Sequence, residues 1–490
     1  MLRELAELRE DAAQLAAGLS RARYRRAAGL PAEETFAALL EAHALAAGPD
    51  GVAQAREALG NARGEDPKRP GRIARLATLL DFLARARALA LEPAAAQELF
   101  DVPQRRLVRP PGDEGLHGAL PAVSVARELA RARSRERRAE LEAALASALQ
   151  PADGARSAAW DAALAAQSEA GLLPPPGTAP WAEKLLSRTE AIFEDLGRWV
   201  LERNTGARPG QAARHDVLHL LHAPRCAPAF LAGELERTVR RWAAMLPLDL
   251  SAVKLDGEDR PLKWPGAIAE PLDPPFQAAI TFLPAEGPRA LEDLLAALGV
   301  AFLRLGPPAD APPEDLWLGD RAVREASAAL LSGLVRDPGW LRRCAGIELA
   351  RDDERAIAVA AVVRARVDAA RALASLQARD SGLGARAAAA HRDLYAKATG
   401  ADLPAGLSLC GLDPWADALA RLQGRALAAR AAAFLRERYD EDWWRNPRST
   451  QSLQGLWARG GRPTCTELWA EMGGEPGIDP LVLEFCGQNR

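Results

Sequence analysis

The chain has 490 residues, of which 48% are hydrophobic, enough for two or three ordinary domains or one large two-lobed body. Its 63 basic and 66 acidic side chains nearly cancel, so a general affinity for nucleic acid is not expected. Five scattered cysteines without a CxxC pair exclude a disulfide framework and a cysteine zinc site. The first residues form a charged segment without an apolar signal core, and no window of about twenty residues lacks charge. The sequence therefore predicts a cytoplasmic protein with no membrane segment.

The first third of the chain is rich in strong helix formers, with apolar residues three and four positions apart. This spacing predicts helices over residues 1–27, 32–47, 52–62, 70–91 and 123–149. Three consecutive prolines, Pro174 to Pro176, then stop a helix, and Thr178 with Pro180 can start the next one. We therefore divide the chain into an N-terminal helical region, 1–172, and a second region, 173–490.

Three of the six histidines, His215, His219 and His222, lie within eight residues. On a helix they would share one side, and Asp216 follows the first of them, so they are a candidate zinc site. Asp216 would replace the glutamate that usually acts as the base, although its side chain is one methylene shorter. A polar stripe on a surface helix accounts for the same spacing.

A β signal lies at 252–284, where short runs at 252–255, 267–269 and 277–283 are separated by turn residues. Three strands are too few for a domain, so we expect a small sheet beside a helical body. From 318 onward the pattern is helical again, with long helices predicted at 352–378 and 415–438. The fold class expected is all-α.

Two helix signals follow the last strand, in the segments Leu294–Phe302 and Leu318–Ala326. This order of strand, helix, loop and helix resembles the gluzincin zinc metallopeptidases of the oligopeptidase F, thimet oligopeptidase and angiotensin-converting-enzyme type. Further segments are similar to parts of that family: Trp181 and Phe193 around Arg188-Thr189-Glu190, then 439–447 and 456–460. The resemblance covers residues 170–490 best.

The resemblance implies a two-lobed helical body with a cleft, and a site that has lost its chemistry. In the family's His-Glu-x-x-His helix, Ala296 replaces the first histidine, Ala297 the glutamate and Val300 the second histidine. Glu325 matches the third zinc ligand. A catalytic zinc needs three protein ligands and a water, so one remaining ligand cannot hold it. We therefore expect a vestigial active site without catalytic residues, metal or cofactor.

The surroundings of this vestigial site can also be predicted. Arg321 or Arg304 is expected to pair with Glu325, which could otherwise be a plain carboxylate near a helix N-terminus. The late helix at 415–422 has no tyrosine or histidine to steady an oxyanion, although Arg421 could bind an anion. The substitutions should leave an apolar floor, and the strand at 276–283 should pair with an extended ligand.

The function expected is a pseudoenzyme, a catalytically inactive metallopeptidase-like protein that binds a peptide or protein partner. One alternative is an active zinc metallopeptidase that uses His215 and His219, although this pair precedes the β segment whereas the family's metal helix follows it. A second alternative is a helical interaction protein unrelated to peptidases. The absence of a sheet beside the helix at 291–304 would support that second alternative.

Overall fold

The computed structural model describes residues 2–65, 80, 106–109, 119–170, 179–207, 210–246, 248–414 and 417–488. Within these ranges helices dominate, and the strands form one three-stranded sheet and two pairs, so the mostly helical fold class is confirmed. None of the described helices combines the length with the apolar character that crossing a membrane requires.

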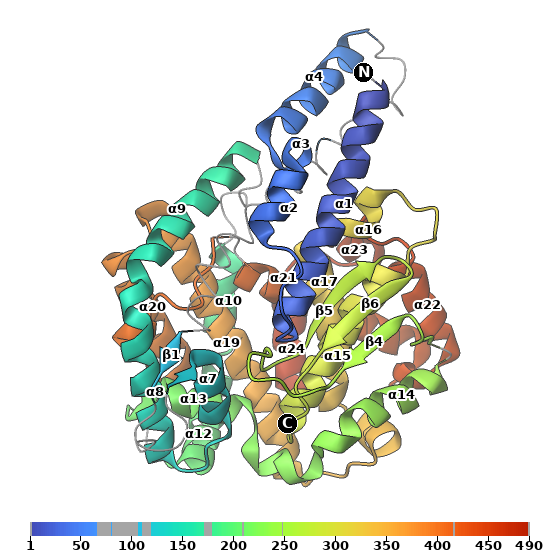
Figure 1. Ribbon diagram of the computed structural model, residues 1–490. Helices are drawn as coiled ribbons and strands as arrows, with labels where there is room; N and C mark the ends of the chain where they lie inside the picture. Colours follow the sequence, from blue (N-terminus) through green and yellow to red (C-terminus); the bar gives the residue numbers. More distant parts are fainter. Residues whose placement is uncertain are drawn as a thin grey trace.

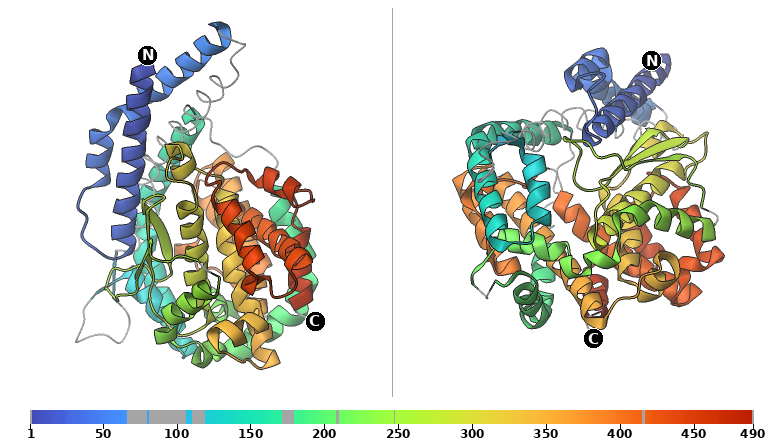
Figure 2. Two further views of the ribbon diagram at one scale, coloured as in Figure 1. Left: turned by 90° about the vertical axis from the view of Figure 1, so that its right-hand side faces the viewer. Right: turned by 60° about the horizontal axis from the view of Figure 1, so that its bottom comes forward.

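The chain begins with a helical arm that stands out from the body (Figures 1 and 2). It consists of α1 (Leu2–Ala27), α2 (Phe36–Ala42), α3 (Ala44–Ala47) and α4 (Pro49–Glu65). The arm has its own apolar cluster, which includes Leu15, Leu59 and, from the body, Leu318. The far end of α1 reaches the sheet, where Ser20 Oγ donates a hydrogen bond to Pro271 O (2.6 Å).

One half of the body lies on the left in Figure 1. Its elements are β1 (Leu107–Val108), β2 (Leu120–Pro121), α7 (Ala122–Arg131), α8 (Arg135–Leu149), η2 (Gln150–Ala152), α9 (Asp153–Ala170), α10 (Ala179–Arg188), α11 (Glu190–Ile192), η3 (Phe193–Gly197), α12 (Arg198–Thr205), β3 (Ala212–Ala213), α13 (Arg214–Leu221), α20 (Ala385–Thr399), β7 (Ala401–Asp402) and η8 (Ala405–Leu407). The single helix predicted over 123–149 is two, because Ser134 starts a new helix by accepting a hydrogen bond from Arg137 N. The helix predicted over 70–91 and the proline boundary lie mostly outside the described residues.

The other half contains the sheet, and long helices join it to the first half (Figure 1). Its elements are η4 (Pro224–Ala229), η5 (Ala232–Glu234), α14 (Leu235–Met245), β4 (Val253–Asp256), β5 (Ile268–Asp273), β6 (Gln277–Thr281), α15 (Pro288–Leu305), α16 (Pro313–Trp317), α17 (Arg321–Ser332), η6 (Gly333–Arg336), α18 (Pro338–Trp340), η7 (Leu341–Ala345), α19 (Arg351–Ser381), α21 (Asp417–Tyr439), η9 (Trp443–Arg445), α22 (Pro447–Trp457), α23 (Cys465–Glu471) and α24 (Asp479–Gln488). The long helices predicted at 352–378 and 415–438 are α19 and α21.

A fully buried arginine fixes the long helix α19 in place. Arg366 donates hydrogen bonds to Leu186 O (2.9 Å) on α10 and to Ala398 O (2.7 Å) on α20. It also binds Glu190 (2.7 Å) and lies over the ring of Phe193. Because hydrogen bonds from a charged donor are the strong ones, this one side chain ties together three helices around α19.

The strand order in the small sheet is β4-β6-β5, with β4 parallel and β5 antiparallel to β6. The three predicted strands are therefore confirmed, but β6 is the central strand and both of its edges are occupied. The expectation that the strand at 276–283 pairs with an extended ligand is wrong for this reason. The sheet lies directly beside α15 (Figure 1), so the absence that would have supported the second alternative is not observed.

Two glycines allow α15, α17 and α21 to pack very closely. A Cβ atom on Gly299 of α15 would collide with Ser327 O of α17, and one on Gly424 of α21 would lie 2.5 Å from Glu325 Cβ. Ser327 Oγ donates a hydrogen bond to Gly299 O (2.8 Å), and Trp457 Nε1 donates one to Ser327 Oγ (3.2 Å). The backbones of the three helices therefore approach where an alanine would hold them apart.

We expect Gly299→Ala to lower the free energy of unfolding by about 1–3 kcal/mol, because overpacking a tight contact forces the backbone to shift. Urea unfolding followed by circular dichroism measures this change. Gly455→Ala in α22 is the matched control, since its Cβ would meet no heavy atom within 4 Å. The control should be unchanged or up to about 1 kcal/mol more stable. Equal stability of the two variants would contradict the close packing described here.

Candidate functional site

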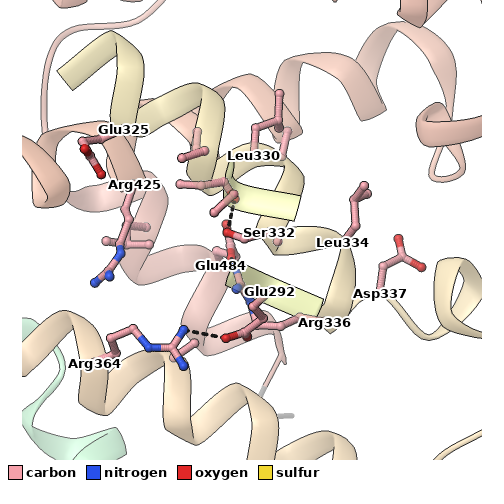
Figure 3. Close-up of a pocket in the computed structure, with 18 of the residues that line it drawn as sticks. Glu292, Glu325, Leu330, Ser332, Leu334, Arg336, Asp337, Arg364, Arg425 and Glu484 are labelled. Atoms are coloured by element: carbon pink, nitrogen blue, oxygen red, sulfur yellow. Dashed lines mark hydrogen bonds and ion pairs between the residues drawn. The ribbon is translucent and has the colours of Figure 1, made fainter. Parts of the chain in front are cut away.

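A cavity of about 210 Å³ lies among α15, α17, α19 and α21. Ala296 of α15 and Glu325 of α17 both line it, so the structure brings these two predicted positions to one cavity. The rest of its charged lining comes mostly from the same helices (Figure 3). These charged residues are Arg289, Glu292, Asp293, Arg336, Asp337, Arg364, Arg421, Arg425, Arg436 and Glu484.

The other two predicted positions do not line this cavity. Ala297 is buried in the main apolar core, with 4% of its surface exposed. Val300 is half-buried one turn further along α15 and is not part of the cavity wall. Ala297 is thus used for packing in the core, and of the four positions Ala296 and Glu325 line this cavity.

Glu325 has a different ion-pair partner from those expected. Arg324 Nη2 lies 3.1 Å from Glu325 Oε1. Arg321 binds Asp417 instead, and Arg304 donates hydrogen bonds to the carbonyl oxygens of the loop before α17. The pairing with Arg321 or Arg304 is therefore wrong. The carboxylate of Glu325 is still matched by a guanidinium.

The expected apolar floor is also wrong, because arginines on three helices face the cavity. Arg364 Nη1 donates a hydrogen bond to Glu292 Oε2 (2.7 Å), as Figure 3 shows. Arg425 Nη1 lies 2.7 Å from Asp368 Oδ2, and Arg289 is paired with Asp293. The sequence signal that could have predicted this charged wall is the set of charged side chains that interrupt otherwise buried, alanine-rich helices.

The arginines crowd one another in a site with little water. Burial lowers the pKa of Arg364 to about 10, and the neighbouring Arg289 adds to this effect. Burial also lowers the pKa of Arg425; Asp368 opposes the shift, whereas Arg421 and Arg289 strengthen it. In contrast, the pKa of Asp368 is lowered. Burial alone would raise this pKa, but the positive charges of the nearby arginines lower it by more. Asp368 is therefore held ionised by the arginines around it.

The residues at this cavity do not fit zinc. Zinc needs three protein ligands, and Ala296 has no lone pair to offer. Glu325 and Glu292 do have carboxylates, but both are bound to arginines. Over the whole of the described chain, no group of three histidine, cysteine, aspartate or glutamate side chains could hold a metal ion.

The histidine cluster has structural partners instead of open positions. His215 Nδ1 lies 2.9 Å from Glu142 Oε2, and both side chains are buried. Asp216 accepts hydrogen bonds from Arg135 and Arg138 and from Ala213 N (3.1 Å), which caps the start of α13. Asp216 is therefore engaged on several sides and is not free to act as a base.

The remaining two histidines are held neutral by their surroundings. Burial lowers the pKa of His219 to about 4; Arg138 adds to the shift and Asp216 opposes it. Burial lowers the pKa of His222 to about 3, with Arg289 and Arg364 adding to it. The pKa of His222 is thus lowered in part by the cavity arginines, whereas His215 binds Glu142. The surface stripe considered for this segment is wrong for His215 and His219, which are buried.

The lowered pKa of His219 predicts a pH-dependent stability. Between pH 6.5 and about 4 the unfolded chain takes up a proton that the folded protein does not, so stability falls as the pH falls. We expect His219→Gln to reduce this loss by about 1.4 kcal/mol per pH unit within that window. Urea unfolding across the range measures it, and a comparison above pH 7 isolates the packing cost of the substitution. The same slope in both proteins would refute the assignment.

The fold is similar to those of solved metallopeptidases. No protein-family model and no curated protein matches the sequence. The Pyrococcus furiosus carboxypeptidase matches with a TM-score of 0.59 at 12% identity, covering 99% of both chains. Metallocarboxypeptidase 1 from Trypanosoma cruzi matches with 0.58 at 12% identity over 100% of both.

A protein from Bacillus anthracis assigned to oligoendopeptidase F has a TM-score of 0.58 at 12% identity, covering 90% of this chain and 81% of its own. Identities this low establish the fold alone. The chain therefore has the helical fold of these metallopeptidases, with a charged, arginine-rich cavity between the two helices predicted to carry the vestigial site.

Proposed function

We propose that this protein is a catalytically inactive metallopeptidase-like scaffold that binds a peptide or protein partner. The fold supports the metallopeptidase part of the proposal, and the composition of the cavity supports the loss of catalysis. Of the four predicted positions, only Glu325 has a side chain able to bind a metal, and Arg324 is paired with it.

One observation carries the proposal: guanidinium groups line the cavity in which a metal cation would have to bind. Arg364 and Arg425 line the same cavity as Ala296 and Glu325 (Figure 3). Fixed positive charges in a site of low dielectric repel a divalent cation strongly. The absence of both imidazoles and the presence of arginines therefore both disfavour zinc binding.

The structure gives less support to an active enzyme at His215 and His219. A zinc site of that kind needs two free imidazoles and a base. His215 is already bound to Glu142, and Asp216 is bound to two arginines. The observations thus favour a structural role for this cluster, in which buried charges link α8 to α13.

We expect purified protein to hold less than one zinc per chain and to show no chelator-sensitive hydrolysis of peptides. Elemental analysis and a fluorogenic peptide assay measure the two quantities. Glu325→Gln and His215→Ala are the diagnostic variants, because each removes a group from one candidate site. Chelator-sensitive hydrolysis that disappears with Glu325→Gln would show an active enzyme at the cavity. Tightly bound zinc that disappears with His215→Ala would place the metal at the rival site.

Restoring ligands tests whether the cavity keeps the geometry of a metal site. Ala296→His combined with Val300→His adds two imidazoles one turn apart on α15. Zinc gains the three ligands it needs if the longer side chain at 300 reaches the cavity that Val300 does not line. We expect zinc to bind at least about tenfold more tightly than to the parent, a change of about 1.4 kcal/mol. Turnover should stay at background, because Ala297 supplies no base. Adding Arg425→Gln should tighten zinc further by removing a repelling cation. A folded double variant that binds zinc no better than the parent would refute the alignment.

A further inference from the structure

Arginines from three helices converge on one cavity. They are Arg289 of α15, Arg364 of α19, and Arg421 and Arg425 of α21. Figure 3 shows Arg364 and Arg425 reaching the cavity from different helices, beside Glu325 and Glu292. Donors that approach from several directions suit a ligand with acceptor atoms on several sides.

The carboxylates around these arginines do not balance them. Glu292, Asp293 and Asp368 are the acids paired with the four arginines. Arg371 is a further cation that acts on Asp368. The other acids of the cavity wall are Glu325, paired with Arg324, Glu484, paired with Arg336, and Asp337, which accepts hydrogen bonds from Trp340 N and Trp444 Nε1. The wall thus carries six arginines against five acids, an excess of one positive charge.

Two further acids lie near Arg421, outside the cavity wall. Asp417 binds Arg321. The pKa of Asp413 is raised to about 6, mainly by burial and then by the charge of Asp417. At neutral pH Asp413 is therefore mostly ionised, and its charge also acts on Arg421.

Three buried donors on arginines of the cavity wall make no hydrogen bond in the described chain, Arg336 Nε, Arg364 Nε and Arg425 Nη1. Arg364 uses Nη1 for Glu292 and Nη2 for Leu221 O (3.3 Å), while its Nε is buried and has no hydrogen-bond partner in the described chain. A buried unpaired donor costs free energy, so a ligand in the adjoining cavity that brings an acceptor to this side chain would be favoured. The cavity, at about 210 Å³, is several times the roughly 30 Å³ that one water occupies.

We propose that this cavity binds the phosphoryl group of a ligand, with Arg364 and Arg425 as the principal contacts and Arg289 and Arg421 beside them. The inference rests on the proposed function, because it takes the cavity to bind a ligand without cleaving it. A phosphoryl group has three acceptor oxygens in a tetrahedral arrangement, which match donors that approach from several helices, and its negative charge suits an arginine-rich wall. A carboxylate is planar and has two acceptor oxygens, so it matches fewer of these directions.

Titration calorimetry with inorganic phosphate, at constant ionic strength set by sodium chloride, tests the site. The pH should be high enough for phosphate to be a dianion. We expect one phosphate to bind per chain of the parent, and Arg425→Ala to weaken binding at least about tenfold. Arg438→Ala is the matched control, because Arg438 lies on the same helix but does not line the cavity. The control should keep the affinity of the parent.

A second variant separates a loss of phosphate binding from a loss of folding. Arg364→Lys keeps the positive charge beside Glu292 but removes the Nε donor, and it should also weaken phosphate binding while preserving the thermal melting profile. No binding to the parent overturns the proposal. Equal affinity in Arg425→Ala and Arg438→Ala overturns it as well, since phosphate would then be bound elsewhere.

A peptide with one phosphoserine and its unphosphorylated form identify the source of the phosphoryl group. Tighter binding of the phosphopeptide than of inorganic phosphate supports a peptide ligand, and weaker binding supports a free phosphate or a small phosphate ester. A failure of the phosphate-binding proposal can be told apart from a failure of the proposed function. Chelator-sensitive hydrolysis would overturn the scaffold role even if phosphate bound, whereas a lack of phosphate binding would leave that role intact.

Discussion

The close packing of α15, α17 and α21 is the constraint on which the cavity depends. Gly299 and Gly424 remove the side chains that would separate these helices, and Ser327 links two of them through a hydrogen bond. Helices normally pack 8–10 Å apart, with side chains filling the space between them. Here the backbones meet directly, so Ala296 and Glu325 open onto one shared space while α21 brings Arg421 and Arg425 to its edge.

The charged cavity is stable only because its members are mutually paired. Taking an isolated charge out of water costs several kcal/mol, and one partner usually cannot compensate for this fully. Asp368 is bound by two arginines and Glu292 by Arg364, so each buried carboxylate has a strong partner. A guanidinium cannot polarise a carbonyl or activate water as a metal does, but it binds anions with fixed geometry. The cavity therefore keeps a positive centre with a different chemistry.

The sequence predicts features that depend on local spacing. The helical pattern from residue 318 onward located α17, α19 and α21, the family resemblance located α15, and short runs between turn residues located the three strands. Strand order was not predictable, because nothing local in 277–283 shows that β4 and β5 take both of its edges. The partner of His215 was missed for a similar reason, since Glu142 lies in another helix 73 positions away. The cavity arginines are spread over α15, α19 and α21, and only the tertiary packing brings them together.

The N-terminal arm is joined to the helix that bears Glu325. Leu318 is part of the apolar cluster of the arm, and Arg9 of α1 binds Glu314 (2.6 Å) just before it. Two residues after Leu318, Asp320 caps α17 by accepting a hydrogen bond from Ala322 N. Segments that share a small cluster open together as a cooperative unit. The arm therefore helps to hold the start of α17, the helix that carries Glu325 to the cavity.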